Sequence, residues 1–253
     1  MFTAAITRSP CPAMIDGIST AGLGAPDYEL ACRQHSDYIA ALKACWLTVT
    51  VLPADPNYPD STCVEDTAVV LPGVAVLTRP GADSRRGETL SMLPVLKRFF
   101  GTAEVIESPG TLEGGDVMQA GTHVYIGLSA RTNRAGAEQL ISIVAKHGLA
   151  GSMIRLEEML HLKSGVSYLE DGNLLACGEL LQKPDWIDMN IVEITPSEAY
   201  AANSLWLNGT VLVPAGHPRS AQAIEDRGYR GVPVDVSEFQ KLDGGLSCLS
   251  LRF

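Results

Sequence analysis

Three side chains of this sequence have the chemistry of a nucleophile, a general acid or base, and a carboxylate that orients the base. Cys248 follows two glycines in the run DGGLSC, and a thiolate attacks better than a hydroxyl. His161 lies between two leucines, and its imidazole could protonate a leaving amine and then deprotonate water. Glu113 precedes a glycine pair and could orient that imidazole. Each residue alone is more often structural, so the hypothesis of a Cys/His/acid site rests on their combination.

Charged side chains near the expected hairpins suit a zwitterionic substrate. Asp60, Glu65 and Asp66 cluster before the first hairpin and could pair with a cation, although strand alternation would send Glu65 and Asp66 to opposite faces. Arg85 and Arg131 each follow a hairpin, and the planar guanidinium fork binds carboxylates. Wet loops and surface salt bridges are the ordinary explanation for each residue by itself. Together with a reactive thiol, these residues favour an arginine-like substrate.

The elements that must position these residues recur along the chain as strand, tight turn and strand, separated by helical patterns. Hairpins are expected at 66–78, 116–126, 166–176 and 204–213. The last two turn at Asp-Gly and Asn-Gly, which are strong hairpin signals. Helices are expected over 28–42, 88–99, 133–147 and 220–227.

The hairpin turns are spaced at intervals that favour a ring of repeated units. The turn glycines lie at positions 73, 121, 172 and 209. A fifth unit would pair an N-terminal strand over 3–7 with a C-terminal strand over 246–252, which would close the ring and remove exposed sheet edges. An open α/β sheet remains the alternative, because hairpins and helices alternate there too. No linker or change in composition divides the chain, so we expect one domain over 1–253.

The overall charge excludes several classes of partner. The chain has 253 residues, of which 29 are acidic and 19 are basic, giving a formal net charge of −10. Binding to nucleic acid is not expected, because neutralising phosphates requires a basic face. No apolar run approaches the roughly 20 residues that cross a bilayer, and the first residues lack the layout of a secretory signal. We therefore expect an acidic globular protein of the cytoplasm that binds no membrane.

The cysteines indicate free thiols instead of a metal site. None of the six forms a CxxC pair, and their spacing is irregular: Cys11, Cys32, Cys45, Cys63, Cys177 and Cys248. In a reducing compartment, unpaired thiols are the default state. The sequence therefore predicts neither a metal nor a cofactor.

Seven motifs, in the same order along the chain, strongly resemble the dimethylarginine dimethylaminohydrolase family. They are YPDSTCVED (58–66), LTRPGADSRRGE (77–88), GTLEGGDVM (110–118), IGLSARTN (126–133), LHLKSG (160–165), AAN (201–203) and DGGLSCLSL (243–251). The resemblance covers essentially the whole chain. That family belongs to the guanidine-modifying group of the pentein superfamily. The resemblance therefore implies an α/β fold, a five-bladed propeller of ββαβ units, in agreement with the five units inferred above.

The resemblance also implies the reaction and its catalytic residues. The family hydrolyses methylated arginine to citrulline and an alkylamine through a covalent thiouronium intermediate on cysteine. At the matching positions, Cys248 is the nucleophile, His161 is the general acid and base, and Glu113 orients the imidazole. Asp66 matches the carboxylate that binds the guanidinium, with Glu65 beside it.

The remaining matches concern the substrate's amino-acid end. Arg85 and Arg131 match the residues that grip the carboxylate, and Asp60 matches the α-amine site together with the backbone carbonyls of Ile18 and Leu242. The glycine-rich stretch 17–28 resembles a mobile lid over the pocket. The partner implied is a small cationic guanidino amino acid, and the family expectation is a homodimer. No metal or cofactor is implied.

One position departs from the family pattern. Where the family has phenylalanine at the guanidine end of the pocket, this chain has Cys63. Replacing a ring by a thiol reshapes that end and removes an apolar face that contacts a cation. A hydrolase or deiminase for arginine or another guanidino or ureido acid therefore remains an alternative. A non-catalytic pentein that binds a partner is a remote one, because that class would lack the nucleophile, the histidine or a pocket acid, and all are present.

Overall fold

The repeating unit is an antiparallel pair of strands followed by a helix and a third strand that runs parallel to the second. In the computed structural model, which describes residues 1–253, β6 (Val117–Ala120) pairs antiparallel with β7 (His123–Leu128). Helix α3 (Arg134–Ala145) then leads to β8 (Ala150–Arg155), which lies parallel to β7. Five three-stranded sheets of this kind make up the structure.

The other units repeat this arrangement. One unit combines β3 (Ala68–Leu71), β4 (Val74–Leu77), α2 (Glu88–Phe100) and β5 (Glu104–Val105). Another combines β12 (Leu205–Leu207), β13 (Thr210–Pro214), α5 (Pro218–Glu225) and β14 (Arg230–Val234). A third combines β9 (Val166–Tyr168), β10 (Asn173–Ala176) and β11 (Asn190–Glu193), with 3-10 turns in place of the outer helix. Two short helices, α4 (Leu162–Gly165) and α6 (Ser237–Gln240), lie outside the repeat.

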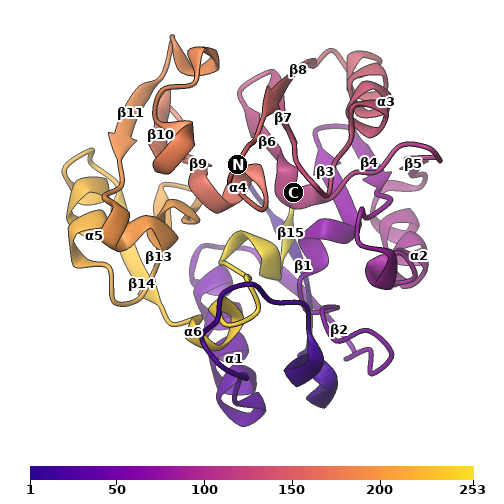
Figure 1. Cartoon of the computed structure of the whole chain (residues 1–253), viewed down its shortest axis with the longest axis horizontal. Coiled ribbons are helices and arrows are strands. Elements are labelled where there is room, and N and C mark those ends of the chain that lie inside the picture. The colour runs from indigo at the N-terminus through magenta and orange to yellow at the C-terminus, as the bar shows by residue number, and fades with distance from the viewer.

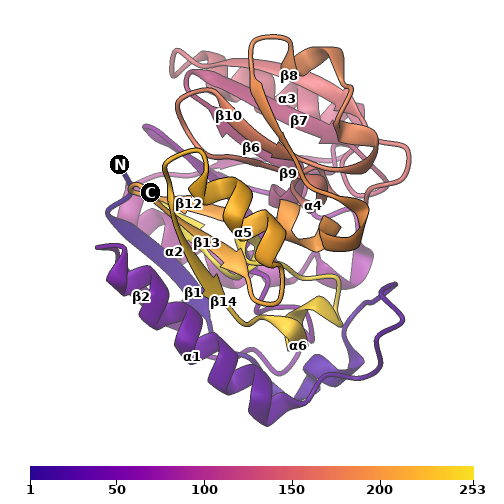
Figure 2. The same ribbon diagram turned by 90° about the vertical axis from the view of Figure 1, so that its left-hand side faces the viewer.

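The ends of the chain complete the fifth sheet. β1 (Ala4–Arg8) lies between β15 (Leu251–Arg252), with which it is antiparallel, and β2 (Thr48–Leu52), with which it is parallel after helix α1 (Tyr28–Ala44). Figure 1 shows the sheets arranged around a centre, and the two termini lie together in Figure 2 as well. The prediction of a five-bladed ring closed by the first and last strands is confirmed.

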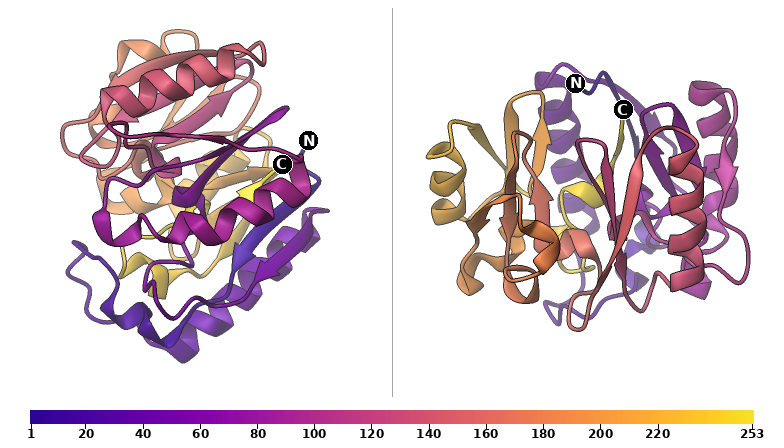
Figure 3. Two further views of the ribbon diagram at one scale, coloured as in Figure 1. Left: turned by 90° about the vertical axis from the view of Figure 1, so that its right-hand side faces the viewer. Right: turned by 90° about the horizontal axis from the view of Figure 1, so that it is seen from above.

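The long helices lie on the outside of the ring, and the cores lie between helices and sheets. Figures 1 and 3 show α3 and α5 at opposite edges of the molecule. On α3, Leu140 and Val144 are fully buried in one cluster with Val124 and Ile126 of β7. Since residues four apart lie on one helix face, the apolar stripe expected over 133–147 fixes this packing. On α2 the spacing of the apolar residues is only a partial guide to burial, because Leu96 is fully buried whereas Leu90 is 74% exposed.

Two local expectations can be compared directly with the structure. The Asn-Gly hairpin turn is confirmed, since Asn208 and Gly209 have φ of +53° and +89°, the left-handed values that such a turn requires. The strand expected over 246–252 is wrong in its first part. Ser247–Leu249 form a 3-10 turn, and only Leu251–Arg252 pair as a strand. This turn brings Cys248 to the centre of the ring instead of a sheet edge.

No helix of the structure combines the length and the apolar character needed to cross a membrane. The single domain and the cytoplasmic location stay predictions.

Candidate active site

One cavity is lined by nearly all the residues that the sequence singled out. Ten of the eleven border it: Ile18, Asp60, Cys63, Asp66, Arg85, Glu113, Arg131, His161, Leu242 and Cys248. The exception is Glu65, which lines two neighbouring cavities. Residues up to 230 positions apart in the chain therefore meet at one place, as the ring predicts.

The repeat explains why these residues meet. In each unit a short turn enters the first strand from the centre of the ring. Asp66 lies in the 3-10 turn before β3, Glu113 directly precedes the turn before β6, His161 precedes α4 and β9, and Cys248 lies in the turn before β15. Equivalent turns from four units thus supply the four candidate catalytic groups.

His161 and Glu113 form a buried pair. His161 Nε2 lies 2.8 Å from Glu113 Oε2, and Glu113 is fully buried. The imidazole also packs tightly against the backbone, because a Cβ on Gly115 would lie 2.8 Å from His161 Nδ1 and 3.0 Å from Asp66 Oδ1. Only glycine fits there, so the glycine pair after Glu113 lets the ring approach the chain.

The carboxylates around His161 favour its protonated form. Burial disfavours the imidazolium, but Asp66, Glu113 and Asp116 outweigh burial and raise the pKa of His161 to about 10. Burial likewise opposes ionisation of Glu113, but the hydrogen bond and charge of His161 lower the pKa of that carboxyl to about 2. At neutral pH the pair therefore consists of an imidazolium and a carboxylate, and His161 is ready to donate a proton.

This pair predicts a pH dependence of stability. The His161 contribution is fully present below the unfolded pKa of 6.5 and is lost as pH rises through about 10. The Glu113 contribution is present above 4.5 and is lost as pH falls through about 2. Between pH 7 and 10 the free energy of unfolding should therefore fall by up to about 1.4 kcal/mol per pH unit on account of His161.

Denaturant titrations of the protein and of His161→Gln at several pH values test this. The difference between the two should shrink as pH rises, and subtracting the variant removes the effect of lysines and tyrosines that titrate in the same range. A difference that stays constant from pH 7 to 10 would show that His161 binds no extra proton in the folded state.

Asp66 is held in place from both sides. Its Oδ1 accepts from the amide of Gly115 at 3.0 Å, and its Oδ2 lies 2.6 Å from Arg85 Nη1. The Arg85 guanidinium also donates to both oxygens of Glu88, at 3.0 and 2.8 Å, and is 6% exposed. Most of the Arg85 N–H groups are therefore already bonded to protein acceptors, which orients Asp66 and leaves little of Arg85 for a ligand.

Arg131 and Asp60, at the same end of the cavity, have fewer protein partners than Arg85. Arg131 Nη1 lies 3.7 Å from Glu113 Oε1 with its side chain 18% exposed. Asp60 Oδ1 accepts from the amide of Ile18 at 3.0 Å, and burial raises the pKa of Asp60. The expected lid, 17–28, is tied at Thr20, whose amide lies 2.6 Å from Asp243 Oδ2. It borders the cavity through Ile18, and its mobility stays a prediction.

Cys248 has a second thiol as its neighbour. Cys63 lines the same cavity, and this neighbouring thiol lowers the pKa of Cys248. The neighbouring Cys248 and burial raise the pKa of Cys63. The amide of Gly245 donates to Cys248 Sγ at 3.4 Å. Both thiols are half-buried and free. The departure from the family pattern therefore lies beside the candidate nucleophile.

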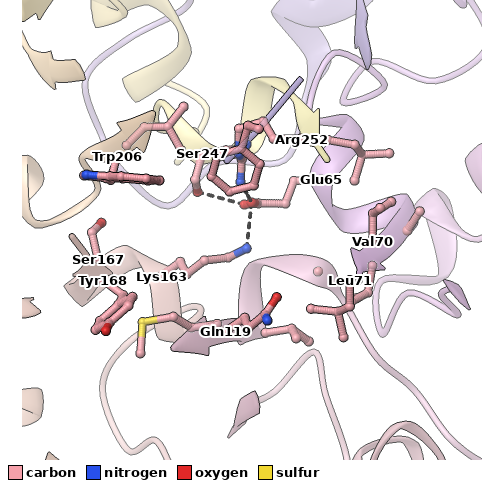
Figure 4. A pocket seen from close by; sticks show the side chains of 18 of the residues that line it. Glu65, Val70, Leu71, Gln119, Lys163, Ser167, Tyr168, Trp206, Ser247 and Arg252 are labelled. Carbon is pink, nitrogen blue, oxygen red and sulfur yellow. Dashed lines mark hydrogen bonds and ion pairs between the residues drawn. The ribbon is translucent and has the colours of Figure 1, made fainter. Parts of the chain in front are cut away.

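Glu65 faces a different set of partners, shown in Figure 4. Its Oε1 lies 2.6 Å from Lys163 Nζ and 3.0 Å from Arg252 Nη2, and its Oε2 accepts from the Ser247 hydroxyl at 2.7 Å. The carboxylate is 3% exposed. These contacts, which we call the Glu65 cluster, favour a structural role over the predicted contact with substrate. A 3-10 turn at Val64–Thr67, and not strand alternation, separates Glu65 from Asp66.

The residues nearest to a metal-binding arrangement are already paired. Asp66, Glu113 and His161 each offer one ligand atom, and these atoms lie within 4.8 Å of one another. His161 Nε2 bonds to Glu113, and Asp66 bonds to Arg85, whose fixed positive charge opposes a bound cation. The donors therefore suit an ion-pair network better than a metal, and the expectation of no metal stays a prediction.

Sequence reasoning missed several groups that support the site. Glu88, the first residue of α2, pairs with Arg85. Asp116 is fully buried and accepts from the Ser129 hydroxyl and the Leu162 amide, at 2.7 and 2.9 Å. The position of Asp116 at the end of the EGGD run could have pointed to its role. No feature of the sequence near Lys163, two residues after His161, pointed to a role for this lysine.

Comparison with known proteins finds relatives along the whole chain. The family model described as arginine deiminase matches residues 64–204. The chain is 52% identical to N(G),N(G)-dimethylarginine dimethylaminohydrolase of Pseudomonas aeruginosa, over 100% of both chains. It is 37% identical to the protein of that name from Streptomyces coelicolor, over 98% of this chain and 96% of the relative.

Solved structures show the same relationship. A Pseudomonas aeruginosa dimethylarginine dimethylaminohydrolase, a cysteine-to-serine mutant complexed with citrulline, superimposes with a TM-score of 0.99 at 51% identity over both whole chains. The N-terminal domain of the cyanobacterial arginine dihydrolase ArgZ has a TM-score of 0.87 at 18% identity, which supports the fold alone. With a ring of five units, a thiol, an imidazole and carboxylates around one cavity, and whole-length relatives at this identity, the chain belongs to the dimethylarginine dimethylaminohydrolase family of the pentein superfamily.

Proposed function

We propose that this protein hydrolyses the guanidinium group of methylated arginine to give citrulline and an alkylamine. The observation that carries the proposal is the cavity at which Cys248, the His161–Glu113 pair and Asp66 meet. The curated relatives named above carry this activity in their names. A Pseudomonas aeruginosa relative was solved with citrulline, and another structure is an adduct with S-methyl-L-thiocitrulline, as a thiol nucleophile would give.

The charges of the cavity match the three ends of such a substrate. Asp66 is held so that its carboxylate can pair with the guanidinium, and Asp60 accepts from the α-ammonium group with the carbonyls of Ile18 and Leu242. Arg131 binds the α-carboxylate. We give Arg131 the larger share of that contact, because the Arg85 fork is already bonded to Asp66 and Glu88.

In the first half-reaction the Cys248 thiolate attacks the central carbon of the guanidinium. The positive charge of the substrate favours the thiolate, and binding at both ends holds the carbon in line with the sulfur. The neutral tetrahedral adduct collapses when His161 donates its proton to the methylated nitrogen. The alkylamine leaves, and a thiouronium cation remains on Cys248.

In the second half-reaction His161 is neutral and can take a proton from water. The hydroxide adds to the thiouronium carbon, the C–S bond breaks, and citrulline leaves with the regenerated thiolate. The hydroxyl proton lost on forming the carbonyl passes to solvent, where it protonates the alkylamine released earlier. Glu113 holds the imidazole in one orientation through both steps and stabilises its charged form.

Cys63 supports a second candidate, a substrate with a different group on the guanidinium. A thiol at the guanidine end is smaller than the phenylalanine of the family pattern, so the apolar face for N-methyl groups is reduced. The same machinery would then release ammonia from arginine or an amine from another N-substituted arginine.

The direct test mixes the protein separately with asymmetric dimethylarginine, monomethylarginine and arginine, and identifies products by mass spectrometry. We expect citrulline plus dimethylamine or methylamine, and no product from Cys248→Ser. Citrulline from arginine alone would favour the second candidate, and no reaction with any of the three would overturn the proposed function.

A parallel series with Cys63→Phe addresses selectivity. If Cys63 sets the preference, the ratio of kcat/KM for the methylated and unmethylated substrates changes in the variant. An unchanged ratio removes Cys63 from selection whatever the absolute rates.

Light scattering on the same preparation measures the oligomeric state. The homodimer stays a prediction.

A further inference from the structure

Cys63 and Cys248 are two thiols that line the same cavity. The other four cysteines lie elsewhere. Cys11 Sγ lies 3.9 Å from the carbonyl of Tyr58, and Cys177 Sγ lies 3.7 Å from that of Ala199. Cys32 is half-buried on α1, and Cys45 directly follows that helix. A pair of thiols therefore faces the cavity of the candidate nucleophile.

The two cysteines are well placed to form a bond. Cys63 directly precedes the turn Val64–Thr67, and Cys248 lies in the turn Ser247–Leu249, which packs against it at the centre of the ring. Both border the same cavity. The Cys63 sulfur also lies against the segment that leads to Cys248, because a Cβ on Gly244 would be 3.5 Å from Cys63 Sγ and the next amide, that of Gly245, donates to Cys248 Sγ at 3.4 Å. Side-chain rotation would bring the two sulfur atoms to the roughly 2.05 Å of a disulfide.

The surroundings make Cys248 the more reactive of the two. The neighbouring Cys63 thiol and the Gly245 amide, which donates to Cys248 Sγ at 3.4 Å, lower the pKa of Cys248, whereas burial and the carboxylates of Glu65 and Asp66 oppose the thiolate. The neighbouring Cys248 and burial raise the pKa of Cys63, which therefore keeps its proton to a higher pH. One thiol is thus prepared to attack and the other to follow, which is the arrangement of an attacking and a resolving cysteine.

We propose that Cys63 and Cys248 form an oxidation site for peroxides, in which Cys63 resolves the oxidised nucleophile as a disulfide. The Cys248 thiolate attacks one oxygen of hydrogen peroxide, the O–O bond breaks, and hydroxide leaves, so that sulfur is oxidised to a sulfenic acid and the peroxide is reduced. The Cys63 sulfur then attacks the sulfenic sulfur, the S–O bond breaks, and water leaves with the Cys63 proton. The product is a Cys63–Cys248 disulfide, which a dithiol reductant reverses.

A cysteine at position 63 can resolve a sulfenic acid at Cys248, which a phenylalanine there could not do. Without a resolving thiol, a sulfenic acid at Cys248 is open to further peroxide and proceeds to the sulfinic acid, which dithiol reductants do not reverse. With Cys63, oxidation stops at a recoverable state. The cavity admits a molecule as small as a peroxide to both half-buried sulfurs, and a bound substrate would exclude it.

The test exposes the reduced protein to hydrogen peroxide, blocks remaining thiols with iodoacetamide in denaturant, and measures mass. We expect a species with four carbamidomethyl groups, where the reduced protein has six, and peptides containing Cys63 and Cys248 linked to each other. Dithiothreitol should abolish the link. In Cys63→Ser the link should be absent, dimedone should label Cys248, and longer exposure should give a sulfinic acid that dithiothreitol leaves unchanged.

A matched control is Cys32→Ser, a half-buried cysteine on α1 that borders neither cavity next to Cys248. It should behave as the unmodified protein. No linked peptide, or sulfinic acid at Cys248 forming equally fast with and without Cys63, would overturn the proposal.

Activity provides a second readout, which rests on the proposed function. The oxidised protein should be inactive toward methylated arginine and should recover with dithiothreitol, whereas oxidised Cys63→Ser should not recover. Because the mass measurement needs no substrate, failure of the proposed hydrolase activity and failure of the oxidation site are separate results.

Discussion

Replacing His161 by glutamine should lower kcat by about 10²–10⁴-fold, the usual contribution of a positioned general acid or base. Glutamine can keep a hydrogen bond to Glu113, but it can neither protonate the departing amine nor take a proton from water. The loss should appear in kcat, because His161 lines the cavities beside Cys248 and transfers protons only after the substrate is bound. Steady-state kinetics on dimethylarginine measures it.

A substrate with a better leaving group separates the two roles of His161. An S-alkylthiocitrulline releases a thiol, which needs no protonation by His161, so the first half-reaction should proceed in His161→Gln. The second half-reaction still needs a base, so the variant should release one equivalent of thiol and retain a covalent adduct on Cys248. Intact-protein mass spectrometry detects that adduct.

His123→Gln is the matched control for this substitution. His123 lies on β7, where its Nε2 is 2.8 Å from the Ser152 hydroxyl, and it borders neither cavity beside Cys248. This variant should retain activity. Full turnover of dimethylarginine by His161→Gln would show that another group transfers the protons.

Replacing Glu65 by alanine should destabilise the protein by about 3–5 kcal/mol, the cost of leaving buried charges without their counter-ion. Lys163 and Arg252 would both lose the carboxylate that neutralises them, and Ser247 would lose its acceptor. The Glu65 cluster also joins the turns that hold Asp66, His161 and Cys248. The remaining folded protein should therefore show a reduced kcat as well.

Denaturant unfolding at neutral pH measures the first effect, with Glu138→Ala as the control. Glu138 pairs with Arg134 at 3.8 Å on the surface of α3, where both side chains are more than half exposed. Such a pair contributes at most about 1 kcal/mol. Equal losses of stability for the two variants would contradict the importance given to the Glu65 cluster.

A less disruptive variant keeps the catalytic part of this prediction testable. Lys163→Met removes one charge of the Glu65 cluster while Arg252 still neutralises Glu65. If the cluster positions Cys248, this variant should lower kcat with little change in KM, since Lys163 does not line the cavity with the arginines.

Much of the fold could be predicted because its signals are local. Glycines at the hairpin turns have the left-handed φ that their position requires, as at Gly73 and Gly121 with φ of +78° and +57°. Helices whose faces pack on one sheet show their periodicity, and each of the expected ranges overlaps an observed helix: 28–42, 88–99, 133–147 and 220–227. The candidate catalytic residues followed from motifs next to glycines, where the chain approaches a side chain closely.

The parts that could not be predicted depend on pairing across the ring. Nothing near Glu65 shows that its partners are 98 and 187 positions away. The turn at Ser247–Leu249 was expected as strand, because a short 3-10 segment lacks a periodic signal. Cys63 and Cys248 line one cavity only because the ring closes, and no local signal in the sequence shows this.

The pairing of β1 with β15 means that the ring is continuous in space although the backbone is interrupted there. The Thr3 amide lies 2.8 Å from the Phe253 carbonyl, so a short glycine linker could join the termini without moving either strand. New ends could then be placed in the exposed turn 145–148, between α3 and β8. Such a circular permutant would carry Cys248 near the middle of the polypeptide, so the nucleophile would leave the ribosome before strands β1 to β7, which now precede it. If such a permutant is active, the active site forms whatever the order in which its strands are synthesised.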